Sequence, residues 1–136
     1  MKVLFVGANP SRHNTDARIA FDGTKSGKVL TTWISALGVT DYHLMNLIDE
    51  VKPKLTKSDL IKGAKRIKEA QYEFDMIIAL GNDAEAACKL AKINCIKLPH
   101  PSPSNRLLNN KQDVNRLLNE TKLLILNIKG LRSGTV

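Results

Sequence analysis

The chain has 136 residues, of which 43% are hydrophobic, so it is long enough to bury one compact core. Lysine and arginine (21) outnumber aspartate and glutamate (13), and the formal net charge of +8 favours a polyanionic partner such as nucleic acid. Aromatic residues make up 4% of the chain, which argues against a broad base-stacking platform. We therefore expect residues 1–136 to form a single domain in which any base stacking rests on very few rings.

The first third of the chain predicts a strand, a loop and a helix. The apolar run at residues 2–6 ends at Gly7 and is typical of a central strand that is buried on both faces. The polar stretch at residues 12–25 predicts a long loop, and long loops at the carboxyl end of a strand usually carry function. From Ser26 the apolar residues recur at helical spacing until Gly38, whose position fits a C-terminal cap.

The rest of the chain alternates between strand and helix patterns. Further strands are predicted over residues 42–48, 74–81 and 93–98. Further helices are predicted from Thr56 or Ser58 to residue 70, from Asn82 or Asp83 to residue 91, and over residues 111–128. Strands separated by helices indicate an α/β fold, a three-layer α/β/α sandwich around a four-stranded parallel sheet. In such a sheet the loops at the carboxyl ends of the strands meet at one crevice where ligands bind.

The stretch at residues 98–106 combines three prolines, a histidine and an arginine between two apolar segments. Each proline fixes its own φ and biases the preceding residue toward extended backbone, so His100 and Ser102 are both held extended. The alternative is a surface turn with a solvated histidine. Three strand ends argue for a site instead, because the Gly7 turn, Asn46 and His100 would all face the same cavity.

Cysteine usage and the N-terminus restrict the class of protein. The two cysteines, Cys88 and Cys95, have neither Cys-x-x-Cys spacing nor histidines at zinc-ligand spacing, so we expect reduced thiols, no disulfide and no structural metal. Met1 leads directly into the first predicted strand, with no apolar targeting segment and no apolar stretch long enough to span a bilayer. We expect a cytoplasmic protein that does not enter a membrane.

Several motifs resemble those of the uracil-DNA glycosylase superfamily. Gly7-Ala8-Asn9-Pro10-Ser11 resembles its first motif, which is Gly-x-Asn-Pro-Gly in the mismatch-specific and single-strand-selective branches. His100-Pro101-Ser102-Pro103 resembles the second motif, and Ser104-Asn105-Arg106 continues it as in the single-strand-selective branch. Residues 21–30 are similar to a Phe-x-Gly-x-x-Gly-Lys-x-Leu segment of the iron-sulfur branch, and residues 44–47 to the segment with a strand-end asparagine.

The resemblance implies a monofunctional glycosylase that flips a nucleotide out of DNA and hydrolyses its N-glycosidic bond. Asn9 and His100 would be catalytic: His100 donates a hydrogen bond to the departing uracil anion, and Asn9 positions water. The efficient branch has aspartate in place of Asn9, so we expect slower turnover here. Phe21 would stack on the base and Asn46 would read its edge, although alone these two would indicate a core ring and a local turn.

Other residues of the site are implied in the same way. Gly7 and Ala8 complete the substrate turn, and Ser11 stands where the strict uracil branch has a bulky tyrosine that blocks a 5-methyl group. We therefore hypothesise that 5-substituted uracils are accepted as well as uracil. DNA contacts would come from the second-motif loop and from basic residues at the mouth, with Arg106 or Leu107 as the wedge: Ser102, Ser104, Asn105, Arg106, Leu107, Arg12 and Lys25.

The chain also departs from the family pattern. The four cluster cysteines of the iron-sulfur branch are missing, so we expect no cofactor, and we expect a monomer whose partner is DNA. Asn9 and Ser11 together match no branch completely. Two alternatives remain open: a glycosylase fold that binds DNA or a modified base as a sensor or regulator, and a nucleotide-binding module that cradles phosphate in the Gly7 turn. Against the second, the chain has no Gly-x-Gly-x-x-Gly or Walker pattern.

Overall fold

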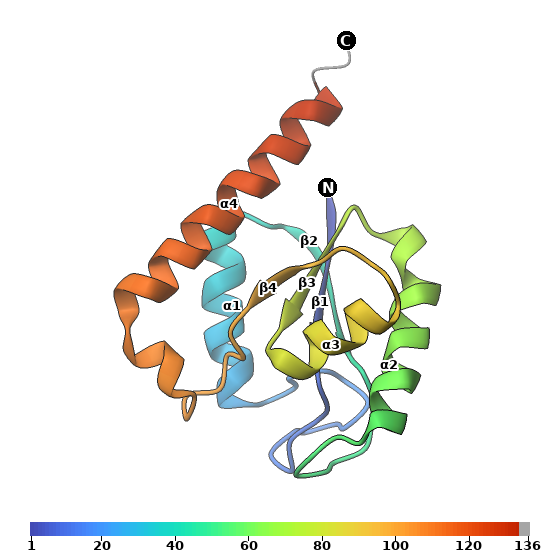
Figure 1. Cartoon of the computed structure of the whole chain (residues 1–136). Coiled ribbons are helices and arrows are strands. Elements are labelled where there is room, and N and C mark those ends of the chain that lie inside the picture. Colours follow the sequence, from blue (N-terminus) through green and yellow to red (C-terminus); the bar gives the residue numbers. More distant parts are fainter. Residues whose placement is uncertain (134–136) are drawn as a thin grey trace.

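A four-stranded parallel sheet forms the centre of the molecule (Figure 1). The structure, a computed structural model, describes the backbone of residues 1–133 and the side chains of residues 1–130. The strands lie in the order β2-β1-β3-β4. Their bounds are Lys2–Gly7 for β1, Asp41–Asn46 for β2, Met76–Leu80 for β3 and Ile96–Leu98 for β4. All three strand pairings are parallel, which confirms the predicted sheet.

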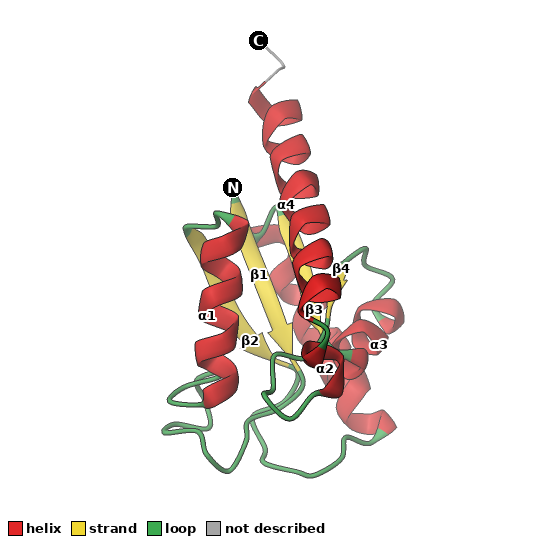
Figure 2. Cartoon of the chain, turned by 90° about the vertical axis from the view of Figure 1, so that its left-hand side faces the viewer, coloured by secondary structure: helices red, strands yellow, loops and turns green. Residues whose placement is uncertain are grey.

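Helices cover both faces of this sheet and complete the predicted three layers. One face carries α1 (Lys25–Leu37) and α4 (Lys111–Ser133), and the other carries α2 (Lys57–Ala70) and α3 (Asn82–Leu90). Figure 2 shows α1 and α4 in front of the sheet. Two short 3₁₀ helices, η1 (Gln71–Glu73) and η2 (Arg106–Asn109), precede β3 and α4.

The alternation of side chains in β1 builds two hydrophobic cores. Val3 and Phe5 pack in a cluster with residues of α1 and α4, whereas Leu4 and Val6 pack in a second cluster with residues of α2 and α3. All four side chains are buried, as predicted for a central strand. Burying each of them stabilises the fold by about 1.5–3 kcal/mol, so β1 holds the two helical layers together.

The ends of three strands differ from the sequence expectation, and β3 spans residues 76–80 instead of 74–81. β2 stops at Asn46 instead of residue 48, because the Leu47 amide turns back to donate to the carbonyls of Gly7 and Ala8. Leu47 and Ile48 are nevertheless buried, which explains their strand-like apolar pattern. β4 begins at residue 96 instead of residue 93, since the Ile93 amide caps α3 by donating to the Cys88 carbonyl.

The helix caps were predicted with mixed success. Thr56 caps α2 as one of the two expected residues, and Gly38 ends α1 in the left-handed conformation, with φ of 71°. Asn82 and Asp83 were the wrong caps for α3, whose N-cap residue is Gly81 with φ of 94°. A Cβ atom at Gly81 would lie 3.2 Å from the Cβ of His100, so a small residue is needed beside the second-motif loop.

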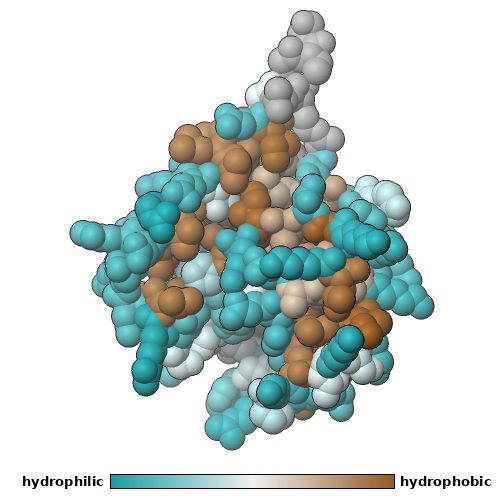
Figure 3. Space-filling model, in the orientation of Figure 1, coloured by the Kyte–Doolittle hydropathy of each residue, from teal (hydrophilic) through white to brown (hydrophobic). Residues whose placement is uncertain are grey.

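The last helix is longer than predicted and extends past the sheet (Figures 1 and 2). The sequence pattern predicted its end at residue 128, whereas α4 continues to Ser133. Figure 3 shows apolar side chains along the outer side of this helix, where Leu123, Leu124 and Leu126 are exposed. The carboxyl ends of the strands lie at the opposite end of the molecule, and the loops there form the candidate site (Figure 1).

Candidate active site

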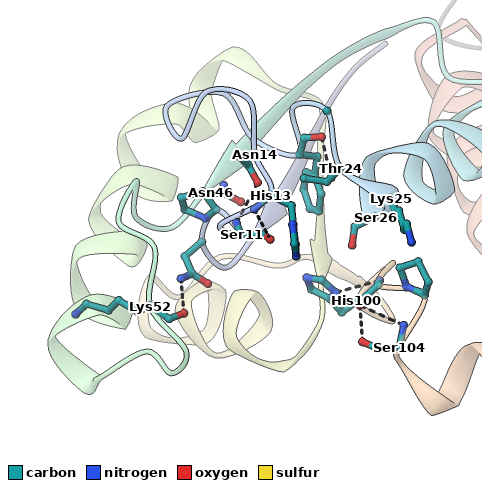
Figure 4. Close-up of a pocket in the computed structure, with 16 residues that line it drawn as sticks. Ser11, His13, Asn14, Thr24, Lys25, Ser26, Asn46, Lys52, His100 and Ser104 are labelled. Carbon is teal, nitrogen blue, oxygen red and sulfur yellow. Dashed lines mark hydrogen bonds between the residues drawn. The ribbon is translucent and has the colours of Figure 1, made fainter.

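A cavity of about 810 Å³ opens at the carboxyl ends of the strands. Loops that follow β1, β2 and β4 line it together with the first residues of α1 (Figure 4). The cavity brings together eight residues that were predicted from the sequence: Asn9, Ser11, Phe21, Lys25, Asn46, His100, Ser102 and Ser104. The convergence expected of the strand ends is therefore present in the structure.

Hydrogen bonds fix the orientation of the Asn9 side chain. Its Nδ2 donates to the carbonyl oxygen of Glu50 at 3.1 Å and to that of Lys52 at 2.9 Å. These two bonds use both amide hydrogens, and no described residue donates to Oδ1. Asn9 therefore offers the cavity a hydrogen-bond acceptor, the atom that can hold a water molecule by its proton.

The imidazole of His100 is held by its own loop. The backbone amide of Ser102 donates to Nδ1 at 3.1 Å, so the neutral ring carries its proton on Nε2 and can donate from there. Burial lowers the pKa of His100 below the ordinary 6.5, although Asp83 acts in the opposite direction. The ring is therefore a neutral hydrogen-bond donor at neutral pH.

The rest of the second-motif loop braces this histidine. Asn105 donates from Nδ2 to the His100 carbonyl at 3.0 Å and accepts the Leu107 amide at Oδ1, so it caps η2 at the same time. The hydroxyls of Ser102 and Ser104 lie 2.8 Å apart and both residues line the cavity. The side-chain amide of Asn105 is engaged inside the loop and does not line the cavity, so its predicted DNA contact stays a prediction.

Phe21 occupies an unusual backbone conformation beside His100. Its φ is 63°, which a bulky L residue adopts only where the surroundings enforce it. The Phe21 carbonyl accepts the Thr24 amide and hydroxyl, and a Cβ atom at Gly27 would lie 2.5 Å from that carbonyl. The first turn of α1 thus holds the ring in the cavity, where its centroid is 6.3 Å from that of His100.

Asn46 presents its amide at the end of β2. The residue is 5% exposed, and no hydrogen bond joins its side chain to any described residue. Among the described residues, every side-chain nitrogen or oxygen atom without a hydrogen-bond partner is exposed to some extent. The Asn46 amide has no such partner and the residue lines the cavity, so its amide atoms are accessible from the cavity. Asn46 pairs with Gly7 across the sheet, and a Cβ at Gly7 would lie 2.7 Å from Asn46 Oδ1 and 2.8 Å from Phe21 Cζ.

Several predicted residues lie outside the cavity lining. Gly7 forms part of its base by allowing Asn46 and Phe21 to approach, and Ala8 contributes its carbonyl to the turn after β2. Arg12, Arg106 and Leu107 do not line the cavity and are exposed.

Other residues that line the cavity were assigned no site role from the sequence, although five of them lie in the motif segments: Pro10, His13, Asn14, Gly23, Thr24, Ser26, Lys52 and Pro103. His13 and Lys52 are the most informative of them. The His13 side chain points into the cavity toward His100 (Figure 4), and its backbone amide donates to Ser11 Oγ at 3.0 Å. Proximity to the first motif was the available signal for His13, whereas nothing in the sequence connects Lys52 to Asn9.

The described residues include no group of three or more His, Cys, Asp or Glu side chains placed to hold a metal ion. Nor does any helix in the described part of the chain have the length and apolar character needed to cross a membrane. Cys88 is buried and Cys95 half-buried; both are free thiols.

Comparison with known proteins agrees with the geometry of this site. A family model described as the Uracil DNA glycosylase superfamily matches residues 1–122. The matched range contains both motif loops and every predicted site residue. Comparisons with curated proteins and with solved structures find no match.

Proposed function

Because the chain belongs to the uracil-DNA glycosylase superfamily, whose membership suggests DNA glycosylase activity, we propose that it hydrolyses the N-glycosidic bond of uracil in DNA. The nucleotide would be flipped into the cavity and an abasic site left behind. One observation carries this proposal: Asn9 and Phe21 of the loop after β1, Asn46 at the end of β2 and His100 of the loop after β4 all line one cavity. Together they supply an acceptor for water, a ring, a readable amide and a neutral donor.

Recognition of the flipped base falls to Phe21 and Asn46. Stacking of a base on an aromatic ring contributes about 1–3 kcal/mol, which offsets much of the cost of leaving the duplex. The accessible amide of Asn46 can donate to uracil O4 and accept from N3–H at the same time. Cytosine presents the opposite pattern at these two atoms, so the same amide disfavours it.

His100 would stabilise the leaving group. The bond between C1′ of the sugar and N1 of the base breaks with both electrons going to the base, so negative charge gathers on uracil O2. A donor placed at this oxygen lowers the barrier more than it stabilises the bound substrate, by about 3–4 kcal/mol for comparable donors. The Ser102 amide on Nδ1 supports this role because it leaves the proton of the neutral ring on Nε2.

Asn9 would position the attacking water. Its Oδ1 accepts a hydrogen bond from the water, whose oxygen then bonds to the cationic C1′. An amide cannot take up the proton released in this step, which passes to solvent or to the departing base. We therefore expect slower turnover than in the aspartate-containing branch.

Contacts to the DNA strand would come from the rim of the cavity. Lys25, Ser102 and Ser104 line the cavity, which supports a role for their polar groups in binding phosphates. Leu107 is 67% exposed beside the second-motif loop, and an exposed apolar side chain at this place supports it over Arg106 as the wedge that fills the vacated stack.

The first motif also bears on substrate range. Ser11 lines the cavity with a small side chain whose hydroxyl accepts the His13 amide. Room at this position supports acceptance of substituents at the pyrimidine 5-position. We therefore include 5-substituted uracils such as 5-hydroxymethyluracil among the proposed substrates.

Alkali cleavage of oligonucleotides tests the proposal directly. The purified chain is incubated with single- and double-stranded oligonucleotides that carry uracil or 5-hydroxymethyluracil, and alkali then cuts the strand at any abasic site. We expect scission at the modified position with wild-type protein and a loss of about 100- to 1,000-fold in rate with His100→Ala. Tight DNA binding without scission would contradict glycosylase activity and favour the sensor alternative.

A further inference from the structure

We propose that Lys52 and Asp59 form a positioning pair that fixes the orientation of the Asn9 amide. This inference rests on the proposed function, because the orientation matters only if Asn9 holds the attacking water. Neither residue belongs to a motif. Lys52 lies in the turn after β2, and Asp59 lies in the first turn of α2.

The two carbonyls that bind Asn9 decide which end of its side chain faces the cavity. Nδ2 donates to Glu50 and Lys52 at 3.1 and 2.9 Å. A rotation that exchanged the amide ends would place Oδ1 against two carbonyl oxygens and lose both bonds. The acceptor end of Asn9 is thus directed by the backbone of residues 50–52, and its placement depends on what holds that backbone.

Asp59 holds this segment through the Lys52 side chain. Lys52 Nζ lies 2.9 Å from Asp59 Oδ2, and the Asp59 side chain is 4% exposed. The same carboxylate oxygen accepts the Thr56 amide at 2.9 Å, and Asp59 donates its own amide to Thr56 Oγ1. Asp59 therefore completes the capping box of α2 with Thr56 and also binds the Lys52 side chain, so it ties the turn to the helix.

The direction of the Lys52 side chain favours positioning over direct contact with DNA. Figure 4 shows that it runs away from His100, so its ammonium group points away from the centre of the cavity. The hydrogen bond with Lys52 and those with Thr56 hold the pKa of Asp59 at about 2, and the same ion pair raises the pKa of Lys52. Both groups are therefore charged at neutral pH, where the ion pair is intact.

Lys52→Met tests the pair, with Lys89→Met as the matched control. Lys89 also forms an ion pair, with Glu85 at 3.7 Å, but it lies at the far end of α3 and does not line the cavity. We expect Lys52→Met to slow single-turnover excision about tenfold while the dissociation constant for DNA changes less than about twofold. Lys89→Met should change neither, and Lys52→Arg, which keeps a cation opposite Asp59, should recover most of the rate.

Two further measurements separate positioning from a general structural role. In an Asn9→Ala background, Lys52→Met should have no additional effect on the rate, because the group that it positions is already gone. In ¹⁵N spectra, the Asn9 side-chain amide protons should exchange with solvent faster in Lys52→Met and in Asp59→Asn than in wild type. This second readout does not require activity, so it judges the pair even if the wild-type protein excises nothing.

The opposite results would overturn the inference. Unchanged exchange of the Asn9 amide protons in Lys52→Met would show that the pair does not hold Asn9. Weaker DNA binding with a smaller dependence on salt, at an unchanged rate of the bound complex, would make Lys52 a phosphate contact instead.

Discussion

The two side chains that we propose to be catalytic, Asn9 and His100, are held in place by different kinds of interaction. His100 is braced from within its own loop, by the Ser102 amide two residues away and by Asn105 five residues away. Asn9 is braced by the carbonyls of Glu50 and Lys52, which are 41 and 43 residues away in the chain. One loop therefore carries its own geometry, whereas the other depends on the packing of β2 and α2 beside it.

Among the changes that test how each loop is braced, Asn9→Asp has the largest expected effect, and it tests the bracing of Asn9 by distant residues. Aspartate stands here in the efficient branch of the superfamily, so sequence alone predicts a faster enzyme. In this structure a carboxylate would face the carbonyls of Glu50 and Lys52 without hydrogens to offer, losing two hydrogen bonds and meeting like partial charges. We expect the excision rate to fall about 100-fold, measured under single-turnover conditions at neutral pH.

Asn119→Asp on the exposed face of α4 is the control for the added negative charge. It should leave the rate unchanged. A rate for Asn9→Asp that equals or exceeds wild type would mean that the two carbonyls do not govern the amide, and the contrast between the loops would fail.

The difference between the loops also decides what the sequence could predict. The strands and the parallel sheet follow from local patterns, and the structure confirms them. Gly7, Asn46 and His100 could be placed near one another because strand ends converge, whereas Phe21 was placed only through the family resemblance. The contacts of Asn9 could not be predicted, because a turn with no motif supplies them and its shape depends on the Lys52–Asp59 pair.

Errors at the element ends have the same origin. Leu47 and Ile48 have an apolar strand pattern, but they are buried after β2 has ended, since the Leu47 amide bonds to two carbonyls of the first-motif turn. Gly81 replaces the expected cap of α3 because His100 packs against it. In both places a contact between distant segments overrides the local preference.

Asn105→Ala tests the bracing of His100 from within its own loop and has an intermediate expected effect. It removes the bond to the His100 carbonyl and the cap of η2, so we expect excision to slow about tenfold and the free energy of unfolding to fall by about 1–2 kcal/mol. Asn110→Ala is the matched control, because Asn110 caps α4 by accepting the Asp113 amide but does not touch His100. Equal losses of rate in the two variants would show that Asn105 has no specific role in holding His100. Oligonucleotide cleavage and urea unfolding measure both quantities.

The smallest expected effect is a pH dependence of the free energy of unfolding that arises from His100. Burial holds the folded-state pKa of His100 below 6.5, so as the pH falls past this value the unfolded chain takes up a proton before the folded chain does. The free energy of unfolding should therefore decrease from pH 7.5 to pH 5.5, and it should decrease less in His100→Asn. Urea unfolding across this range measures the difference, and identical slopes for the two proteins would contradict it. The interactions that hold Asn9 add no pH dependence between pH 7.5 and pH 5.5, because Asn9 does not titrate and the pKa of Asp59 is about 2. A loss of stability in this pH interval that depends on His100 would therefore be a property of the His100 loop and not of the loop that carries Asn9.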